Sequence, residues 1–281
     1  MNAGIRGRRR TAAVIATAGA LALSVLNAPA AQARDTGIVL SDLVINNGRP
    51  VVVGTSRVVE PPISFNIALP PGYSTEHPFR YDAHPFLYRG SLTEAADTGD
   101  SYIGPGGYTC FDVSSKRARC EGTLYIDPHP SREQVDSNSD ATKWKIAVSL
   151  RLFKADEVTL VAQEFETRPG GVSLRRAANL TAADATPEPV AKGKKVTVAG
   201  KLTRANWTTH KNGPYVGSAV RLQFRAKGAT TFKTLKWVTT NSAGALRTQV
   251  TASTDGFFRW MFYGNTTTGT ATSGQDYIDV R

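Results

Sequence analysis

The chain has 281 residues, of which 41% are hydrophobic and 20% charged, and its formal net charge is +11. This composition supplies enough apolar material for a folded core and excludes a disordered or collagen-like polymer. The basic balance favours solubility and anionic partners. With two Cys, two Met and four His, the sequence offers few groups for metal or redox chemistry.

The N-terminal segment has the three parts of a secretory signal peptide. Four arginines lie within residues 6–10, residues 12–26 form an apolar stretch, and Ala31-Gln32-Ala33 has the small-x-small pattern of a cleavage site. The apolar stretch is shorter than the roughly 20 residues that span a bilayer. We therefore predict a signal peptide over residues 1–33, a secreted, extracellular protein and no transmembrane segment.

The two cysteines, Cys110 and Cys120, lie in the predicted exported part of the chain. Disulfides form and persist in oxidising compartments. Residues 108–113 and 117–126 are typical of two strands around a turn at Ser114-Ser115-Lys116, which places the cysteines opposite each other. The sequence predicts a disulfide; the alternative is two neighbouring thiols in a reduced core.

Charge divides the mature chain near residue 177. Residues 34–176 hold 16 basic and 18 acidic residues, whereas residues 177–281 hold 14 basic and 5 acidic residues, a net charge of +9. A change of this size predicts two domains. We expect an N-terminal domain over residues 34–176, containing the disulfide, and a basic C-terminal domain over residues 177–281.

Period-two alternation predicts strands in both domains. Residues 145–152 alternate between polar and apolar, which is typical of a half-buried strand, and residues 220–225 and 258–262 repeat the pattern. Short strands separated by Gly, Asn and Asp turns favour an all-β fold of two Ig-like β-sandwiches in tandem, with over roughly 40% strand. The shared core of the second domain is expected to hold Leu222, Phe224, Phe258 and Trp260.

Two segments of the chain, Gly48–Gly54 and Gly193–Gly200, have weakly similar sequences and form a possible internal repeat. Each segment reads as a turn that feeds the second strand of a sandwich, which suggests that the first domain is Ig-like as well. The alternative is a common turn-to-strand pattern without a shared origin.

Five segments of the C-terminal domain carry a more specific pattern: Thr186–Val190, Lys192–Val198, Gly200–Trp207, Asp255–Trp260 and Asp276–Val280. They resemble a family of secreted actinobacterial proteins of Streptomyces type that have a C-terminal bacterial Ig-like domain. In the first domain Leu43–Asn46, the cysteine pair and Asn138–Asp140 carry a looser resemblance. The resemblance implies an exported β-sandwich protein without an assigned activity. Some members of this family are labelled calcium-binding.

The candidate calcium ligands in this sequence are Asp136, Asn138 and Asp140. Alternate side-chain oxygens at this spacing match the first half of a calcium loop. The second half does not match, because Ala141 replaces the glycine of the sharp turn and Ala147 replaces the bidentate carboxylate. We predict an Asx-rich turn and no EF-hand-like site; a different calcium site that uses these residues is a weak alternative.

No catalytic motif is found in the sequence. The nucleophile elbow, the H-E-x-x-H zinc signature and the phosphate loop are absent from the mature chain. His77, His84 and His129 each precede a proline. They could form a metal site with Asp127; the alternative is that they are extended residues in turns, as is typical before proline. We predict no catalytic residues and no cofactor.

A candidate ligand face follows from the expected sandwich. The third and sixth strands of an Ig-like domain are neighbours, so their outward residues should lie together. These residues are Arg221, Gln223, Arg225, Phe257, Arg259 and Tyr263. Guanidinium groups beside aromatic rings suit sulfated, phosphorylated or uronic polymers; the alternative is a basic face that serves only solubility.

The sequence therefore predicts a non-enzymatic secreted protein that acts by surface recognition. Its partner would be an anionic polymer such as a cell-envelope glycan, or a protein surface; specific nucleic-acid binding is not expected. The alternatives are a calcium-dependent extracellular binding protein and a secreted enzyme without a recognisable motif.

Overall fold

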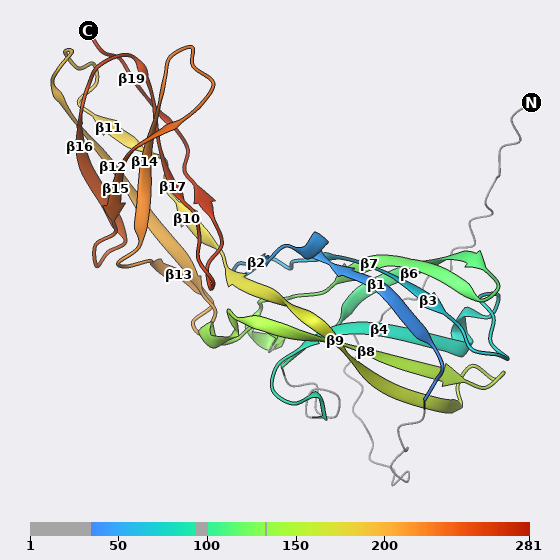
Figure 1. Ribbon diagram of the computed structural model, residues 1–281. Helices are drawn as coiled ribbons and strands as arrows, with labels where there is room; N and C mark the ends of the chain where they lie inside the picture. The colour runs from blue at the N-terminus through green and yellow to red at the C-terminus, as the bar shows by residue number, and fades with distance from the viewer. Residues whose placement is uncertain (1–34, 94–100, 133) are drawn as a thin grey trace, which may run out of the picture. The chain divides into compact units, whose positions relative to one another are not determined.

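The computed structural model describes residues 35–93, 101–132 and 134–281 (Figure 1). The predicted signal peptide lies outside the described residues. Of the described residues, 56% lie in strands, which confirms the predicted all-β class. Two compact units are present: unit 1 contains the described residues up to Val51 with Val58–Asp127 and Lys143–Val172, and unit 2 contains Val52–Arg57, Pro128–Thr142 and Ser173–Arg281.

Unit 1 is built on two sheets. The first has the order β1-β3-β7-β6: β1 (Val39–Ile45), β3 (Pro62–Ala68), β7 (Arg117–Leu124) and β6 (Pro105–Ser114). The second has the order β2-β9-β8-β4-β5: β2 (Val51–Val53), β9 (Leu160–Arg176), β8 (Lys143–Phe153), β4 (Tyr81–Tyr88) and β5 (Tyr102–Ile103). The last residues of β2 and β9 continue into unit 2. This strand order corresponds to the two sheets of an Ig-like sandwich.

Strand β8 differs from its prediction as a half-buried strand. Ala147 and Ser149, expected on the solvent face, are buried together with Val148 and Leu150. For Ala147 a small apolar cluster explains this difference, because Ala147 packs there with Phe86 and neighbouring aromatic residues. The alternation along β8 could not predict that Ala147 is buried, because the residues that pack on it come from other segments of the chain.

The cysteines lie opposite each other in the β6–β7 hairpin, as predicted. Cys110 and Cys120 form a disulfide with a Cα–Cα distance of 4.0 Å. Cys120 is fully buried, and its cross-strand neighbour on β3 is the buried residue Phe65. The bond therefore ties an edge strand to the middle of its sheet.

Removal of this bond should destabilise unit 1. We expect Cys110→Ser with Cys120→Ser to lower its free energy of unfolding by about 3 kcal/mol, because the reduced chain regains loop entropy. Urea unfolding of the full chain measures the change. Mass spectrometry of the unreduced exported protein should find no alkylatable thiol, and alkylation of both residues without reductant would contradict the prediction.

Unit 2 also has two sheets. In the first, β12 (Lys195–Asn206) pairs with β10 (Ala178–Leu180), β11 (Asp184–Thr186), β13 (Lys211–Pro214) and β16 (Ala245–Thr251). In the second, β15 (Lys233–Thr239), β14 (Ala219–Ala226) and β17 (Gly256–Phe262) are neighbours, and β18 (Ala271–Thr272) and β19 (Asp276–Ile278) pair with β17. Leu222, Phe258 and Trp260 are buried in one core, against which Phe224 packs, as predicted.

The two segments with weakly similar sequences, Gly48–Gly54 and Gly193–Gly200, form strands at different positions in their sheets. Val51–Val53 forms the short strand β2 next to β9, whereas Lys195–Asn206 forms the central strand β12 of its sheet. The repeated turn-to-strand pattern therefore does not mark equivalent strands.

Unit 2 includes two segments, Val52–Arg57 and Pro128–Thr142, that the division by charge assigned to the N-terminal domain. Trp207 Nε1 donates to the Gly54 carbonyl at 2.9 Å, and the Ala177 amide donates to the Val53 carbonyl at 2.8 Å. Short 3₁₀ turns, η3 (Pro130–Arg132) and η4 (Asn138–Asp140), lie in the second segment, and η1 (Asn46–Gly48) and η2 (Pro78–Arg80) lie in unit 1. The units are thus not the two contiguous chain segments that the charge distribution predicts.

Candidate functional site

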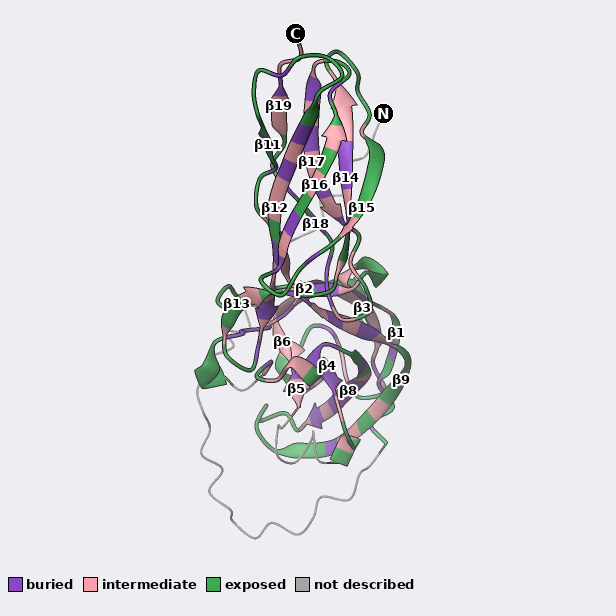
Figure 2. Cartoon of the chain, turned by 90° about the vertical axis from the view of Figure 1, so that its left-hand side faces the viewer, coloured by how far each residue is buried: buried purple, intermediate pink, exposed green. Residues whose placement is uncertain are grey.

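The outer face of the β14–β17 pair brings the predicted ligand residues together. In the observed register Gln223 pairs with Arg259 and Arg225 pairs with Phe257. Residues of β17 alternate between buried and partly exposed (Figure 2). On β14 Arg221 and Arg225 are partly exposed, whereas Gln223, predicted as an exposed ligand residue, is buried. Because Leu222, Phe258 and Trp260 point into the core, the residues between them share the opposite face.

Cations and aromatic rings alternate across this surface. The Arg221 guanidinium lies 4.3 Å from the centre of the Trp237 ring and 4.1 Å from that of Tyr263. Arg259 lies 3.8 Å from the ring centre of Phe232, and Arg225 lies 4.5 Å from that of Phe257. Each such contact contributes about 0.5–1 kcal/mol at a partly exposed site. We call this surface the Arg–aromatic face: Arg221, Gln223, Arg225, Phe232, Trp237, Phe257, Arg259 and Tyr263.

Sequence reasoning missed two members of this face, Phe232 and Trp237. The register of β14 with β15 shifts between Leu222 and Gln223, so Thr234 pairs with Gln223 and Trp237 pairs with Arg221. The bulge at Leu235 lets Thr234 and Trp237, which are three positions apart, lie on one face. The apolar side chains in residues 232–237 were a usable signal, but simple alternation assigned them to no face.

The three arginines of the face differ in their hydrogen bonds. Arg225 Nη1 donates to the Ala229 carbonyl at 2.8 Å, and its Nη2 donates to Gln275 at 3.1 Å. Arg259 Nε donates to Gln223 Oε1 at 2.9 Å. Within the described part of the chain, no hydrogen bond engages the terminal nitrogens of Arg221 or Arg259, and Arg221 Nε is buried without a partner. Arg225 is thus held in place, whereas the terminal nitrogens of the other two arginines can donate to a ligand.

Carboxylates are scarce on the Arg–aromatic face. Among the described ion pairs, none involves Arg221, Arg225 or Arg259. Asp255 directly precedes β17, and it contacts Lys227 at 3.7 Å and accepts a hydrogen bond from Tyr277 at 3.0 Å. The three guanidinium groups therefore have no internal counter-charge in the described structure.

The weak calcium candidates have other partners. Asp140 caps η4, because its Oδ2 accepts from the Ser137 amide at 2.9 Å and from the Asp136 amide at 3.2 Å. Asn138 Oδ1 accepts from Arg176 Nη1 at 2.6 Å and from the Trp207 amide at 3.1 Å. Across the described residues, no three His, Cys, Asp or Glu side chains are grouped as metal ligands. The segment joins parts of unit 2 through these bonds.

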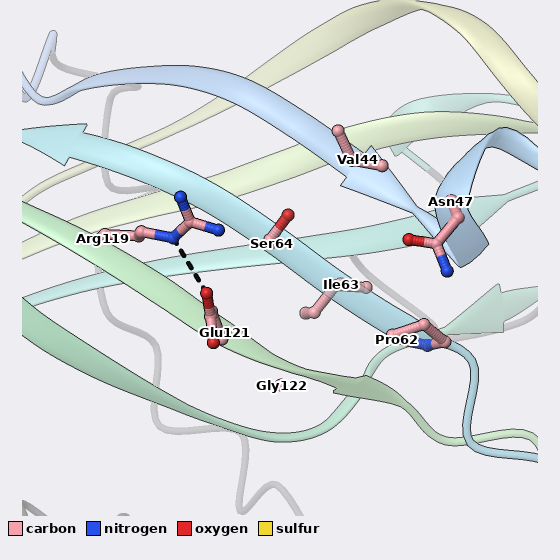
Figure 3. Close-up of a pocket in the computed structure, with 8 residues that line it drawn as sticks. All are labelled: Val44, Asn47, Pro62, Ile63, Ser64, Arg119, Glu121 and Gly122. Atoms are coloured by element: carbon pink, nitrogen blue, oxygen red, sulfur yellow. Dashed lines mark hydrogen bonds and ion pairs between the residues drawn. The ribbon is translucent and has the colours of Figure 1, made fainter.

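An open pocket of about 340 Å³ lies on the outer face of the first sheet of unit 1 (Figure 3). Arg119 and Glu121 of β7 line it and form an ion pair of 2.9 Å. Val44, Pro62 and Ser64 lie along the same hollow. The pocket contains no histidine, and its two charged groups are paired with each other, so it offers no activated nucleophile.

His84 lies in β4, which corrects its assignment to an extended turn. It pairs in register with Ser149 of β8, and its Nδ1 is 3.8 Å from Asp82 Oδ2. Asp82 also accepts from Arg151 Nε at 3.0 Å and from the Tyr108 hydroxyl at 2.8 Å. Burial lowers the pKa of His84; Arg151 acts in the same direction and Asp82 opposes it.

The depressed pKa of His84 predicts an acid-sensitive unit 1. In the unfolded chain histidine titrates near 6.5, so below that pH the unfolded state binds a proton that the folded state resists. The free energy of unfolding should therefore fall as the pH drops from about 7 to 5. Urea unfolding at each pH should show a smaller fall for His84→Gln. Equal pH dependence in both proteins would contradict this role of His84.

Comparisons with known proteins show loose structural similarity alone. No protein family matches the sequence, and no curated protein matches it. Three N-terminal domains of the outer capsid protein Hoc of bacteriophage RB49 align at 10% identity over 87% of this chain and 69% of that one, with a TM-score of 0.30. The ectodomain of mouse nectin-like molecule 4 aligns at 10% identity over 86% and 63%, with a TM-score of 0.25.

A protein from Corynebacterium diphtheriae described as membrane-anchored aligns at 10% identity over 86% of this chain and 56% of that one, with a TM-score of 0.27. The chain thus spans less than two thirds of this protein and of the nectin-like ectodomain. Within the described residues, no helix has the length and apolarity to cross a membrane. The strand order itself defines the fold: the protein consists of tandem Ig-like β-sandwiches.

Proposed function

We propose that the protein is an exported, non-enzymatic binding protein that recognises anionic polymers through the Arg–aromatic face. One observation carries this proposal: three arginines share a sheet face on which no described carboxylate pairs with them. Among the described hydrogen bonds, none engages the terminal nitrogens of two of these arginines, Arg221 and Arg259. Guanidinium groups bind carboxylate, sulfate and phosphate oxygens through paired N–H donors.

The spacing of the charges supports a polymer over a single small anion. Antiparallel strands rise about 3.4 Å per residue, so Arg221 and Arg225 lie about 14 Å apart along β14. Arg259 lies opposite Gln223, midway between them. The face therefore presents positive charge about every 7 Å along the strand. A chain of repeated negative charges can contact such a row at several points.

The other functions inferred from the sequence have weaker support. A calcium-dependent role would need oxygens at Asp136, Asn138 and Asp140, and those of Asn138 and Asp140 already accept hydrogen bonds. An enzyme would need a reactive group beside a substrate pocket, and the His84–Asp82 pair lines none of the described pockets. Membership of the secreted actinobacterial family remains part of this proposal.

Binding to heparin or teichoic-acid resin tests the proposal. We expect the full mature chain to be retained at low salt, with the logarithm of affinity falling almost linearly with the logarithm of salt concentration. Arg221→Ala and Arg259→Ala should each weaken binding about tenfold, because each removes charge-assisted hydrogen bonds. Quantitative titration at one fixed salt concentration measures the difference.

Lys192→Ala and Lys194→Ala are the matched controls. Both lysines are exposed in the turn before β12 and lie outside the Arg–aromatic face. Each should weaken binding about twofold, as expected for diffuse attraction. Equal losses for all four variants would show that net charge alone attracts the polymer, and no retention at low salt would refute the proposed function.

A further inference from the structure

Trp237 has an unusual position for a large apolar side chain. It lies in β15, which pairs with β14 on one side and forms the edge of its sheet. Its side chain is 57% exposed, although the Arg221 guanidinium stacks on its ring. One cation covers only part of an indole, so a substantial apolar surface remains open at the margin of the Arg–aromatic face.

Neutral polar groups surround the charged donors next to this ring. Gln223 Nε2 lies 3.5 Å from the Thr234 hydroxyl and 3.4 Å from the Tyr263 hydroxyl. Thr234 and Tyr263 are exposed, and each hydroxyl can donate and accept. Phosphate oxygens need donors alone, whereas the hydroxyl groups of a sugar need donors and acceptors. The mixed groups therefore suit a ligand that carries hydroxyls as well as acid groups.

From this arrangement we infer that the ligand is an acidic polysaccharide, with one sugar ring packed on the open part of Trp237 and an acid group held by Arg221 and Arg259. The inference rests on the proposed function and specifies its ligand class. Arg221 contacts Trp237 directly, so a ring on the indole brings its acidic substituent close to this guanidinium. A few placed polar groups beside an apolar surface are the usual composition of a specific ligand site.

A single-stranded nucleic acid fits the same face less well. Successive bases stack on a series of open aromatic rings. On this face the Phe232 ring lies next to the guanidinium groups of Arg259 and Arg225, and Phe257 lies between Arg225 and Tyr277. Phe232 and Phe257 are therefore partly covered within the protein, and Trp237 is more exposed than these two rings or Tyr263.

The test compares three polymers on the full mature chain at one salt concentration. Polygalacturonate carries a carboxylate on each sugar ring, long-chain inorganic polyphosphate carries charge without rings, and oligo-dT carries phosphates and bases. We expect Trp237→Ala to weaken polygalacturonate binding about tenfold and to leave polyphosphate binding within about twofold. Trp237→Phe should retain most of the affinity, because it keeps an aromatic ring.

Leu235→Ala is the matched control, since Leu235 lies in the same edge strand and is 49% exposed. It should change binding to none of the three polymers. If Trp237→Ala affects polygalacturonate and polyphosphate equally, or affects neither, the inference of a sugar platform is wrong. A larger loss on oligo-dT would replace the polysaccharide by a nucleic acid. Binding of wild-type protein to polyphosphate alone would overturn only this inference, whereas binding to no polymer would overturn the proposed function as well.

Discussion

Replacing Trp260 by alanine is expected to lower the free energy of unfolding of unit 2 by about 3–5 kcal/mol. Trp260 is fully buried in the middle of the unit 2 core. Its Nε1 donates to the Ala199 carbonyl at 2.9 Å, so one side chain of β17 connects the two sheets of the sandwich. The substitution removes apolar contacts and also leaves that carbonyl without its donor.

Hydrogen exchange of β12, β14 and β17 in the full chain measures this loss within unit 2. Trp237→Ala is the control, because the same residue type is removed from an exposed edge position and the cost should stay below about 1 kcal/mol. Gly200→Ala should act like a milder form of Trp260→Ala, because an added Cβ would lie 2.6 Å from Trp260 Nε1. Similar losses for Trp260→Ala and Trp237→Ala would contradict the described core.

Asn138→Ala should lower the free energy of unfolding of the same unit by about 2–4 kcal/mol. The amide oxygen of Asn138 accepts from the Arg176 guanidinium and from the Trp207 amide, and its Nδ2 donates to Asn206 Oδ1 at 2.9 Å. Arg176 is only 8% exposed, so its charge would lose an acceptor where little water can replace it. Urea unfolding followed by hydrogen exchange reports the loss.

Two variants and one condition sharpen this test. Asn138→Asp keeps an acceptor for Arg176 and should lose less stability than Asn138→Ala. Ser139→Ala changes an exposed neighbour in the same turn and should cost less than about 0.5 kcal/mol. The effect of Asn138→Ala should be the same with calcium and with a chelator. An effect that appears only with calcium would restore the calcium site at Asp136, Asn138 and Asp140.

In unit 2 the positions of the core residues determine the positions of the residues on the Arg–aromatic face. Leu222 and Trp260 point inward because the core requires apolar side chains, and in a strand this requirement places Arg221, Gln223 and Arg259 on the other face. Core packing therefore positions the candidate ligand face. Destabilising core variants should reduce polymer binding only in proportion to unfolding, whereas Arg221→Ala should reduce binding by the folded protein.

The sequence by itself determined the features that depend on local pattern. Alternation along residues 220–225 and 258–262 identified two strands and their core-facing sides, because a strand has a fixed period of two. The burial of Gln223 on the opposite side did not follow from this alternation. Hairpin spacing identified the Cys110–Cys120 pair, since two strands joined by a tight turn must place such positions opposite each other. The pairing of β14 with β17, and with it the common face of Arg221 and Arg259, followed from the expected Ig-like topology.

Only the tertiary structure decided the features that depend on contacts between distant segments. Trp237 joined the Arg–aromatic face through a bulge in β15, His84 entered a buried strand through pairing with β8, and Asn138 became a structural acceptor because Arg176 and Trp207 meet there. The unit boundary changed for the same reason, since Gly54 and Asn138 bond to residues far along the chain. Local periodicity specifies the direction of a side chain relative to its own strand, whereas its partners are set by the packing of segments that sequence spacing does not connect.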